Sequence, residues 1–277
     1  MKTCKLVICD IDGTIVVKHK KLTSRAKKVI NLLQQNGIYF GIASGRPIFQ
    51  IKETIKGWGY DDFDVLIGLN GSSLKDSLTQ KQYEYFRMKK EWIKETIELM
   101  KPFDAHPSIY TNNAQIFVFE DDFSRQASTF SGLKTIVTHD MASMYLKDNA
   151  KIMFRIEESK MPQVEEWIKN HPSEHYIGFK TQPNLIEFCD KRVSKGYALR
   201  SFCSMHDIDL EEVAAFGDTS NDNDMLKISG LGVCLLNGSE DTKAAADIIT
   251  DKTCDEDGWA DYMEKHFISK YKKLAQG

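Results

Sequence analysis

The stretch Lys5-Leu6-Val7-Ile8-Cys9-Asp10-Ile11-Asp12-Gly13-Thr14 joins a short apolar run to two acidic residues. Residues 5–9 have the length of a buried strand. Apolar residues then recur at helical spacing from Ala26 to Leu33, and residues 38–43 and 64–69 form two more short apolar runs. Repeated strand–helix–strand order implies a parallel sheet with right-handed crossovers. We therefore expect an α/β core built on a Rossmann-like, doubly wound parallel sheet.

The alternation of strands and helices is interrupted between Asn70-Gly71 and Ser194. Residues 72–86 are typical of a hairpin, and the strand-like segments after them alternate with amphipathic helices, which predicts an α+β insert. The parallel rhythm resumes with strands near residues 213–217 and 231–235. A chain of 277 residues is long enough for two hydrophobic cores. We predict a core of residues 1–82 and 184–277 and an inserted cap domain of residues 83–183.

Composition limits the kinds of partner that the chain can have. A formal net charge of −3 and a pI near 6.2 argue against a surface that neutralises many nucleic-acid phosphates. The first apolar run stops at Asp10, too early for a signal peptide, and no run of about 20 apolar residues could span a membrane. Six scattered cysteines without a CxxC pair favour reduced thiols. We expect a cytoplasmic monomer or weak dimer that binds a small molecule, with no nucleic-acid or membrane partner.

Asp10 and Asp12 follow the first predicted strand, so both lie at the carboxyl edge of the sheet, where open α/β folds bind their ligands. Residues two apart in an extended segment point the same way, so both carboxylates can face one substrate. Gly13 allows the backbone to turn sharply and approach a phosphate, and Thr14 adds a hydroxyl donor. Two acids before a glycine also occur in ordinary turns, so this segment alone does not establish a site.

Two further segments carry groups that suit phosphate. Ser44, Gly45 and Arg46 follow the second predicted strand and supply a hydroxyl, a backbone N–H and a guanidinium at the same sheet edge. Lys195 opens a helix after the insert and places an ammonium near its positive N-terminus. Taken singly, each segment is better explained without a site, as a strand-to-helix turn or a solvated lysine.

The segment Gly217-Asp218-Thr219-Ser220-Asn221-Asp222 favours a functional site over a set of ordinary turns. It follows another apolar strand and presents two acids at the strand end, with Asn221 between hydroxyl and carboxylate side chains. Hard oxygen ligands beside a phosphate suit Mg²⁺, which takes one or two protein carboxylates and keeps several waters. The sequence therefore predicts a magnesium site at this edge.

In order, the four segments resemble the four motifs of the haloacid dehalogenase (HAD) superfamily: DxDGT, Ser or Thr before Gly-Arg, Lys, and GDxxND. The place of the insert, the Asn70-Gly71 step and Asp255-Glu256-Asp257-Gly258 resemble the Cof-type sugar phosphatase subfamily, which has a large α/β cap. The resemblance covers the whole chain. Ile11, Ser44 and Thr219 depart from the commonest residues of these motifs, but none of the three changes removes a catalytic group.

The resemblance implies a Mg²⁺-dependent phosphatase, a phosphomonoester hydrolase that acts on a small phosphorylated metabolite. A hexose or pentose phosphate is the first expectation, with pyridoxal phosphate or a flavin mononucleotide as competitors. Asp10 is expected to attack phosphorus and form an aspartyl-phosphate, while Asp12 protonates the leaving oxygen and later activates water. The implied metal ligands are Asp10, the backbone carbonyl of Asp12, Asp218 and, directly or through water, Asp222. The implied substrate contacts are Thr14, Ser44, Gly45, Arg46, Lys195 and Asn221.

Three other functional classes need to be considered. A phosphomutase of this superfamily would use the same aspartyl-phosphate, because fold and motif do not fix the reaction. A non-catalytic sugar-phosphate-binding protein would keep the pocket, but it could lose one of the acids without harm, and none is missing here. A nucleotide-binding oxidoreductase would need GxGxxG after a strand, which this sequence lacks.

Overall fold

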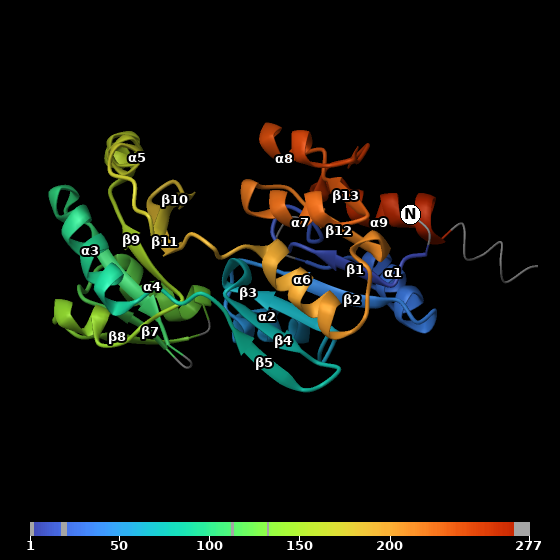
Figure 1. Ribbon diagram of the computed structural model, residues 1–277, viewed down its shortest axis with the longest axis horizontal. Coiled ribbons are helices and arrows are strands. Elements are labelled where there is room, and N and C mark those ends of the chain that lie inside the picture. The colour runs from blue at the N-terminus through green and yellow to red at the C-terminus, as the bar shows by residue number, and fades with distance from the viewer. Residues whose placement is uncertain (1–2, 18–20, 112–113, 132, 269–277) are drawn as a thin grey trace, which may run out of the picture. The chain divides into compact units, whose positions relative to one another are not determined.

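The computed structural model describes residues 3–17, 21–111, 114–131 and 133–268. The chain divides into a core unit, residues 1–85 with 194–277, and an inserted unit, residues 86–193. The core unit contains the parallel sheet and the inserted unit a second, mainly antiparallel sheet (Figure 1). The predicted α/β class with an α+β insert is confirmed. None of the described helices is long and apolar enough to cross a membrane.

The core sheet has eight strands in the order β14-β13-β12-β1-β2-β3-β4-β5. Strands from β14 to β3 run parallel, and β4 and β5 add an antiparallel hairpin at one edge. The strands are β1 Leu6–Cys9, β2 Tyr39–Ala43, β3 Val65–Gly68, β4 Ser73–Asp76, β5 Lys81–Glu84, β12 Val213–Gly217, β13 Leu231–Cys234 and β14 Ile248–Ile249. The first predicted strand thus lies at the centre of the sheet.

Helices cover both faces of the core sheet, which explains why its strands are apolar on both sides. Alternate residues of β1 belong to two hydrophobic clusters: Val7 packs with residues of α1, α2 and α9, and Leu6 packs with residues of α6 and α7. The helices are α1 Ser24–Gln35, α2 Ile48–Gly57, α6 Lys195–Met205, α7 Asn223–Ile228, α8 Glu240–Ala245 and α9 Gly258–Met263. Helix α1 begins after Thr23 because the Thr23 hydroxyl accepts a hydrogen bond from the backbone N–H of Ala26 at 3.0 Å.

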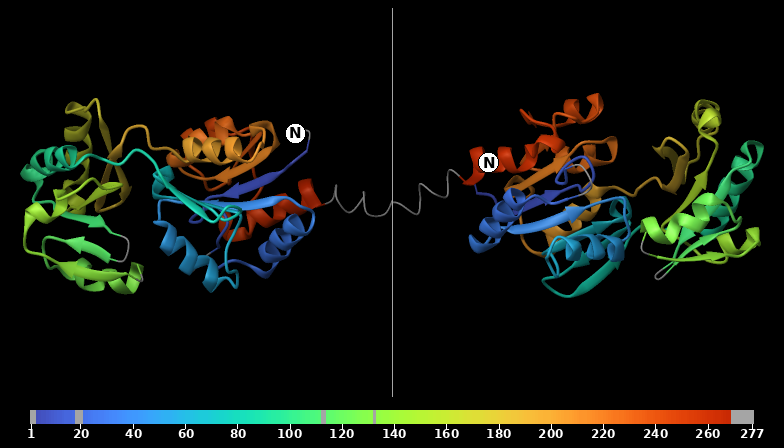
Figure 2. Two further views of the ribbon diagram at one scale, coloured as in Figure 1. Left: turned by 60° about the horizontal axis from the view of Figure 1, so that its bottom comes forward. Right: turned by 180° about the vertical axis from the view of Figure 1, so that it is seen from behind.

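The inserted unit, coloured from green to yellow in Figure 2, contains a second sheet. This sheet has six strands in the order β10-β11-β9-β6-β7-β8. All neighbouring pairs are antiparallel except β7 and β8. Its elements are α3 Lys90–Met100, β6 His106–Tyr110, β7 Ala114–Phe117, α4 Asp122–Ser131, β8 Lys134–Val137, β9 Lys151–Arg155, α5 Met161–Asn170, β10 Tyr176–Gln182 and β11 Leu185–Asp190. Residues of α3, α5 and the central strands share one hydrophobic core.

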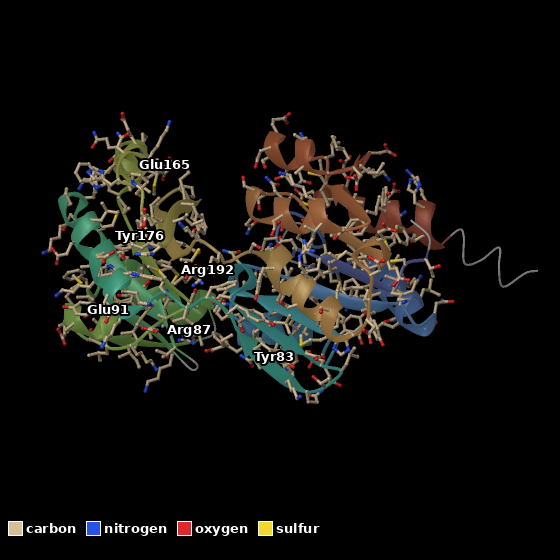
Figure 3. The ribbon with its side chains drawn as sticks, in the orientation of Figure 1. Tyr83, Arg87, Glu91, Glu165, Tyr176 and Arg192 are labelled. Carbon is tan, nitrogen blue, oxygen red and sulfur yellow. The ribbon has the colours of Figure 1, made fainter. Side chains whose placement is uncertain are left out.

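The boundaries of the insert differ from the predicted 83–183. Strand β5, up to Glu84, pairs with β4 of the core sheet, so the insert begins later, at Phe86. Strand β11 pairs with β9 and β10, so the insert continues to Val193. Arg192 ion-pairs with Asp190 at 2.7 Å and lies over the ring of Phe86 at 4.5 Å, which joins the two ends of the unit. Figure 3 labels Arg192. Sequence periodicity did not predict these boundaries, because they depend on pairing between strands that lie far apart in the sequence.

Candidate active site

The predicted site residues come together at one edge of the core sheet. Asp10, Ser44 and Asp218 each follow directly on the last residue of β1, β2 or β12, which are neighbours in the sheet. Because these strands are parallel, their carboxyl ends share an edge. Lys195 is the first residue of α6, and its side chain reaches the same group of acids.

Lys195 is fully buried between two carboxylates. Its Nζ donates to Oδ1 of Asp10 at 2.7 Å and to Oδ1 of Asp222 at 2.6 Å. Burial disfavours the ammonium, but Asp10 and Asp222 outweigh it and raise the pKa of Lys195 above its ordinary value. Lys195 is therefore a buried, charged residue of the site and not a solvated residue at the start of a helix.

Helix α6 begins at this lysine because Ser194 caps it. The Ser194 hydroxyl accepts from the backbone N–H of Tyr197 at 2.9 Å and donates to Oδ2 of Asp224 at 2.5 Å. Asp224 had no role in the sequence-based site. In the structure it fixes the residue that precedes the buried lysine.

Asp10, Asp218 and Asp222 form a buried acidic group. One carboxylate oxygen of each lies within 4.8 Å of those of the other two, which suits a metal ion. Thr14 Oγ1 donates to Oδ1 of Asp218 at 2.7 Å, and Oδ2 of Asp222 accepts from the backbone N–H groups of Asp218 and Thr219 at 3.0 and 3.1 Å. These hydrogen bonds hold the carboxylates in place.

Electrostatics in this group disfavour negative charge. Burial raises the pKa of Asp10, and the neighbouring Asp222 and Asp218 add to the rise, while Lys195 opposes it. Burial also raises the pKa of Asp218 to about 6, against the hydrogen bond from Thr14. Three acids share one buried ammonium, so the group has an excess of acidic side chains that a divalent cation would neutralise.

The Asp12 side chain points to a different partner. Arg46 Nη2 lies 2.8 Å from Oδ1 and 2.6 Å from Oδ2 of Asp12, and Arg46 Nε lies 3.1 Å from Oδ2. Arg46 Nη1 also donates to Thr54 at 3.0 Å. The guanidinium that the sequence assigned to phosphate is thus paired with the predicted acid, whose side chain is 47% exposed.

Ser44 and Asn221 lie on either side of a residue that sequence analysis gave no role, Asn70. The backbone N–H of Asn70 donates to the Ser44 carbonyl at 3.1 Å. Asn221 Nδ2 donates to Oδ1 of Asn70 at 3.0 Å, and a Cβ added to Gly45 would lie 3.2 Å from the same oxygen. Only the position of the Asn70-Gly71 step before the insert could have drawn attention to this residue.

Gly13 is required where the first motif meets the last. Its φ is +85°, and an added Cβ would lie 2.2 Å from Oδ2 of Asp218. Asn237 Nδ2 donates to the Gly13 carbonyl at 2.9 Å, a contact across 224 residues of sequence that no local pattern indicates. The turn therefore brings the backbone of the first motif against a candidate metal ligand.

Gly13→Ala should displace Asp218 and cut kcat/KM by roughly 10²-fold, because misplacing a site by about 1 Å has an effect of that size. The magnesium concentration needed for half-maximal activity should rise as well. Steady-state kinetics over a magnesium titration measure both. Gly57→Ala is the matched control, since an added Cβ there has no heavy atom within 4 Å. Equal kinetics for the two variants would contradict this account.

Comparison with known proteins identifies the family. Residues 7–263 match a family model described as haloacid dehalogenase-like hydrolase. The chain belongs to this family. Phosphatase YwpJ of Bacillus subtilis is 24% identical over 289 residues, which cover 95% of this hydrolase and 100% of YwpJ.

Solved structures share the fold of this hydrolase. A haloacid dehalogenase-like hydrolase from Bacteroides thetaiotaomicron matches with a TM-score of 0.83 and 25% identity, covering 96% of this chain and 100% of that chain. The HAD subclass IIB sugar phosphatase BT4131 matches with a TM-score of 0.79 and 22% identity, covering 94% of this chain and 98% of its own. The family match and the curated relative YwpJ confirm the prediction of a phosphatase of the HAD superfamily.

Proposed function

We propose that this hydrolase is a Mg²⁺-dependent phosphomonoester hydrolase that acts on a small phosphorylated metabolite through an aspartyl-phosphate. The observation that carries the proposal is the buried group in which Lys195 lies between Asp10 and Asp222. A sugar phosphate is the first substrate class to test, because the structurally similar BT4131 is a sugar phosphatase.

Asp10 is the proposed nucleophile. Its Oδ1 is held by Lys195, whereas Oδ2 accepts no hydrogen bond from the described part of the chain. Oδ2 would attack phosphorus while the bond from phosphorus to the leaving oxygen breaks, which gives an aspartyl-phosphate and an alcohol. Water then cleaves the phosphate from Asp10 and restores the carboxylate. Lys195 would stabilise charge on the transferring group through both steps.

Asp12 is the proposed general acid and base. Its exposed carboxylate would exchange Arg46 for the leaving oxygen, donate a proton to that oxygen and later take one from water. Arg46 then acts on Asp12 by orienting it between turnovers, and its predicted role as a phosphate contact becomes secondary. Ser44 and Gly45 would contact the phosphate from the end of β2, while Thr14 orients Asp218.

The residues present fit Mg²⁺. Asp10, Asp218 and Asp222 supply hard oxygen ligands within 4.8 Å of one another, and the backbone carbonyl of Asp12 would complete the protein's share. When bound, the cation offsets repulsion between the carboxylates and the incoming phosphate. Asp222 already accepts three hydrogen bonds. We therefore propose that it binds the metal more weakly than Asp10 and Asp218 do, either directly or through water.

The inserted unit, residues 86–193, is the proposed cap that selects the leaving group. The chain leaves the core at Tyr85 and re-enters it at Ser194, immediately before Lys195. A unit attached next to the catalytic lysine is suited to exclude water and to contact the part of the substrate that is not phosphate.

A phosphate-release screen over phosphorylated sugars, pyridoxal phosphate and flavin mononucleotide, with magnesium present, tests the proposal. We expect release of inorganic phosphate from at least one sugar phosphate. Isomerised sugar phosphate without free phosphate would instead indicate a phosphomutase. Saturable binding without either product would indicate a non-catalytic sensor.

Chelation of divalent metal should abolish turnover, and added magnesium should restore it. Without the cation, the buried carboxylates repel the phosphate of the substrate. Calcium should compete with magnesium without supporting turnover, since its larger and looser coordination shell misplaces the nucleophile. Phosphate release in excess chelator, with magnesium or calcium added back, measures the effect. Full activity in excess chelator would rule out the metal requirement.

A further inference from the structure

The loop between β13 and α8, residues 235–239, is hydrogen-bonded to two motif segments of the site. The backbone N–H of Ser239 donates to the carbonyl oxygen of Asp218 at 2.8 Å. From the same loop, Asn237 Nδ2 donates to the Gly13 carbonyl at 2.9 Å. One loop therefore contacts both the first and the last motif, which lie far apart in the sequence.

Little space separates this loop from Asp218. A Cβ added to Gly238 would lie 2.3 Å from Sγ of Cys234 and 3.1 Å from the carbonyl oxygen of Asp218. Only glycine fits so close to these atoms, so the loop is packed tightly against the end of β12. Asn237 precedes this glycine, and its backbone position is fixed by the same contacts.

The two partners of the Asn237 amide fix its orientation. Oδ1 of Asn237 accepts from the backbone N–H of Cys254 at 2.7 Å, while Nδ2 donates to the Gly13 carbonyl. A backbone N–H can only donate and a carbonyl oxygen can only accept, so exchanging the oxygen and nitrogen of this amide would break both bonds. Cys254 begins the short helix Cys254–Glu256, which follows β14. Asn237 therefore joins the first motif to the segment after β14.

The carbonyl that Asn237 holds belongs to the peptide between Gly13 and Thr14. Because a peptide is planar, holding this oxygen also restricts the N–H of Thr14. Thr14 Oγ1 donates to Oδ1 of Asp218 at 2.7 Å, and a Cβ added to Gly13 would lie 2.2 Å from Oδ2 of Asp218. A shift of this peptide would therefore move two close neighbours of the Asp218 carboxylate.

We propose that Asn237 is a positioning residue for metal binding, which holds the Gly13–Thr14 peptide so that Asp218 keeps the orientation of a metal ligand. This inference rests on the magnesium site of the proposed function. Residues that orient metal ligands from outside the ligand shell alter metal affinity when they are removed. Asn237 is exposed, so its hydrogen bonds compete with water and contribute little to the stability of the fold.

Calorimetric titration of the metal-free full chain with magnesium chloride is the first measurement. In Asn237→Ala the magnesium dissociation constant should rise roughly tenfold, the lower end of the effect of removing residues that orient metal ligands. The urea midpoint of the metal-free protein should change little. KM at saturating magnesium should stay near its wild-type value, because Ser44 and Lys195 lie outside this chain of hydrogen bonds. A residue with only a structural role would instead lower the urea midpoint and leave the magnesium dissociation constant unchanged.

Cys254→Pro and Cys254→Ala test the same contact from its other side. Thr253 has a φ of −71° and a ψ of 164°, an extended conformation that is favoured before proline, and proline suits the first position of a helix. Proline lacks the N–H that donates to Asn237, and its ring would displace the amide. Cys254→Pro should therefore weaken magnesium binding about as much as Asn237→Ala, and the double variant should lose little more. Cys254→Ala keeps the N–H and is the matched control, for which we expect wild-type magnesium binding.

Equal magnesium dissociation constants for Asn237→Ala and the wild type would overturn the proposal, and so would equal values for Cys254→Pro and Cys254→Ala. If one of the two disruptive variants does not fold, the other decides. If the wild type binds magnesium but releases no phosphate from any phosphomonoester, the proposed function fails, and the titrations still test the role of Asn237. If the wild type does not bind magnesium, both the metal requirement and this inference fail.

Discussion

Asp10→Asn should abolish turnover without loss of stability. The amide cannot serve as a nucleophile, and removing a nucleophile that works as part of a unit lowers kcat by up to about 10⁶-fold. Burial and two neighbouring acids raise the pKa of Asp10, so a neutral side chain of the same shape should be tolerated at least as well as the carboxylate. Steady-state phosphate release and urea unfolding of the metal-free protein measure the two effects.

Asp61→Asn is the matched control for this variant, because Asp61 is an exposed acid of the core unit. It should leave both turnover and stability unchanged. Labelling with beryllium fluoride should place the phosphate mimic on Asp10 in the wild type and nowhere in Asp10→Asn. Appreciable turnover by Asp10→Asn would show that the attacking group is another residue.

Lys195→Met should have the largest effect on stability. The change leaves Asp10 and Asp222 buried without their shared partner, and breaking a buried ion pair in this way costs about 3–5 kcal/mol. Turnover should fall by at least roughly 10²–10³-fold, because the cation that stabilises the transferring phosphate is lost. Urea unfolding and steady-state kinetics give the two values.

The pH dependence of the Lys195→Met deficit tests its cause. A carboxyl whose pKa is raised in the folded protein contributes stability that is present at low pH and is lost as pH rises through the folded pKa. Without Lys195 the carboxyl pKa values should rise further, so the deficit should shrink as pH falls from about 8 to about 5. Lys5→Met, which removes a surface pair with Glu212, should leave stability nearly unchanged at every pH. A pH-independent deficit would point to lost packing instead of unpaired charge.

Part of the site was accessible from sequence because it depends on local order. Asp10, Ser44 and Asp218 were predicted at one edge since each follows an apolar run of strand length, and parallel strands present their carboxyl ends together. The residue types at those ends then indicated phosphate and magnesium. These inferences needed only the spacing of neighbours along the chain.

The partner of each side chain, in contrast, depends on contacts between residues that lie far apart in the sequence. Thr14 meets Asp218 across 204 residues, and Asn221 meets Asn70 across 151. Arg46 pairs with Asp12 across 34 residues, although its sequence position suggested a phosphate contact. A donor forms a hydrogen bond with an acceptor that the fold brings close to it, and the hydrophobic periodicity of the sequence does not predict that acceptor.

The sequence by itself therefore determined the fold class, the order of the motifs and the acids at the sheet edge, because strand length and helical spacing are local properties. Only the tertiary structure decided where the insert ends and which of the predicted groups face one another. Strand β11 joins the inserted sheet through pairing with β9 rather than through any signal of its own. Lys195 becomes part of the site because the fold buries it between two acids, where its charge must be paired.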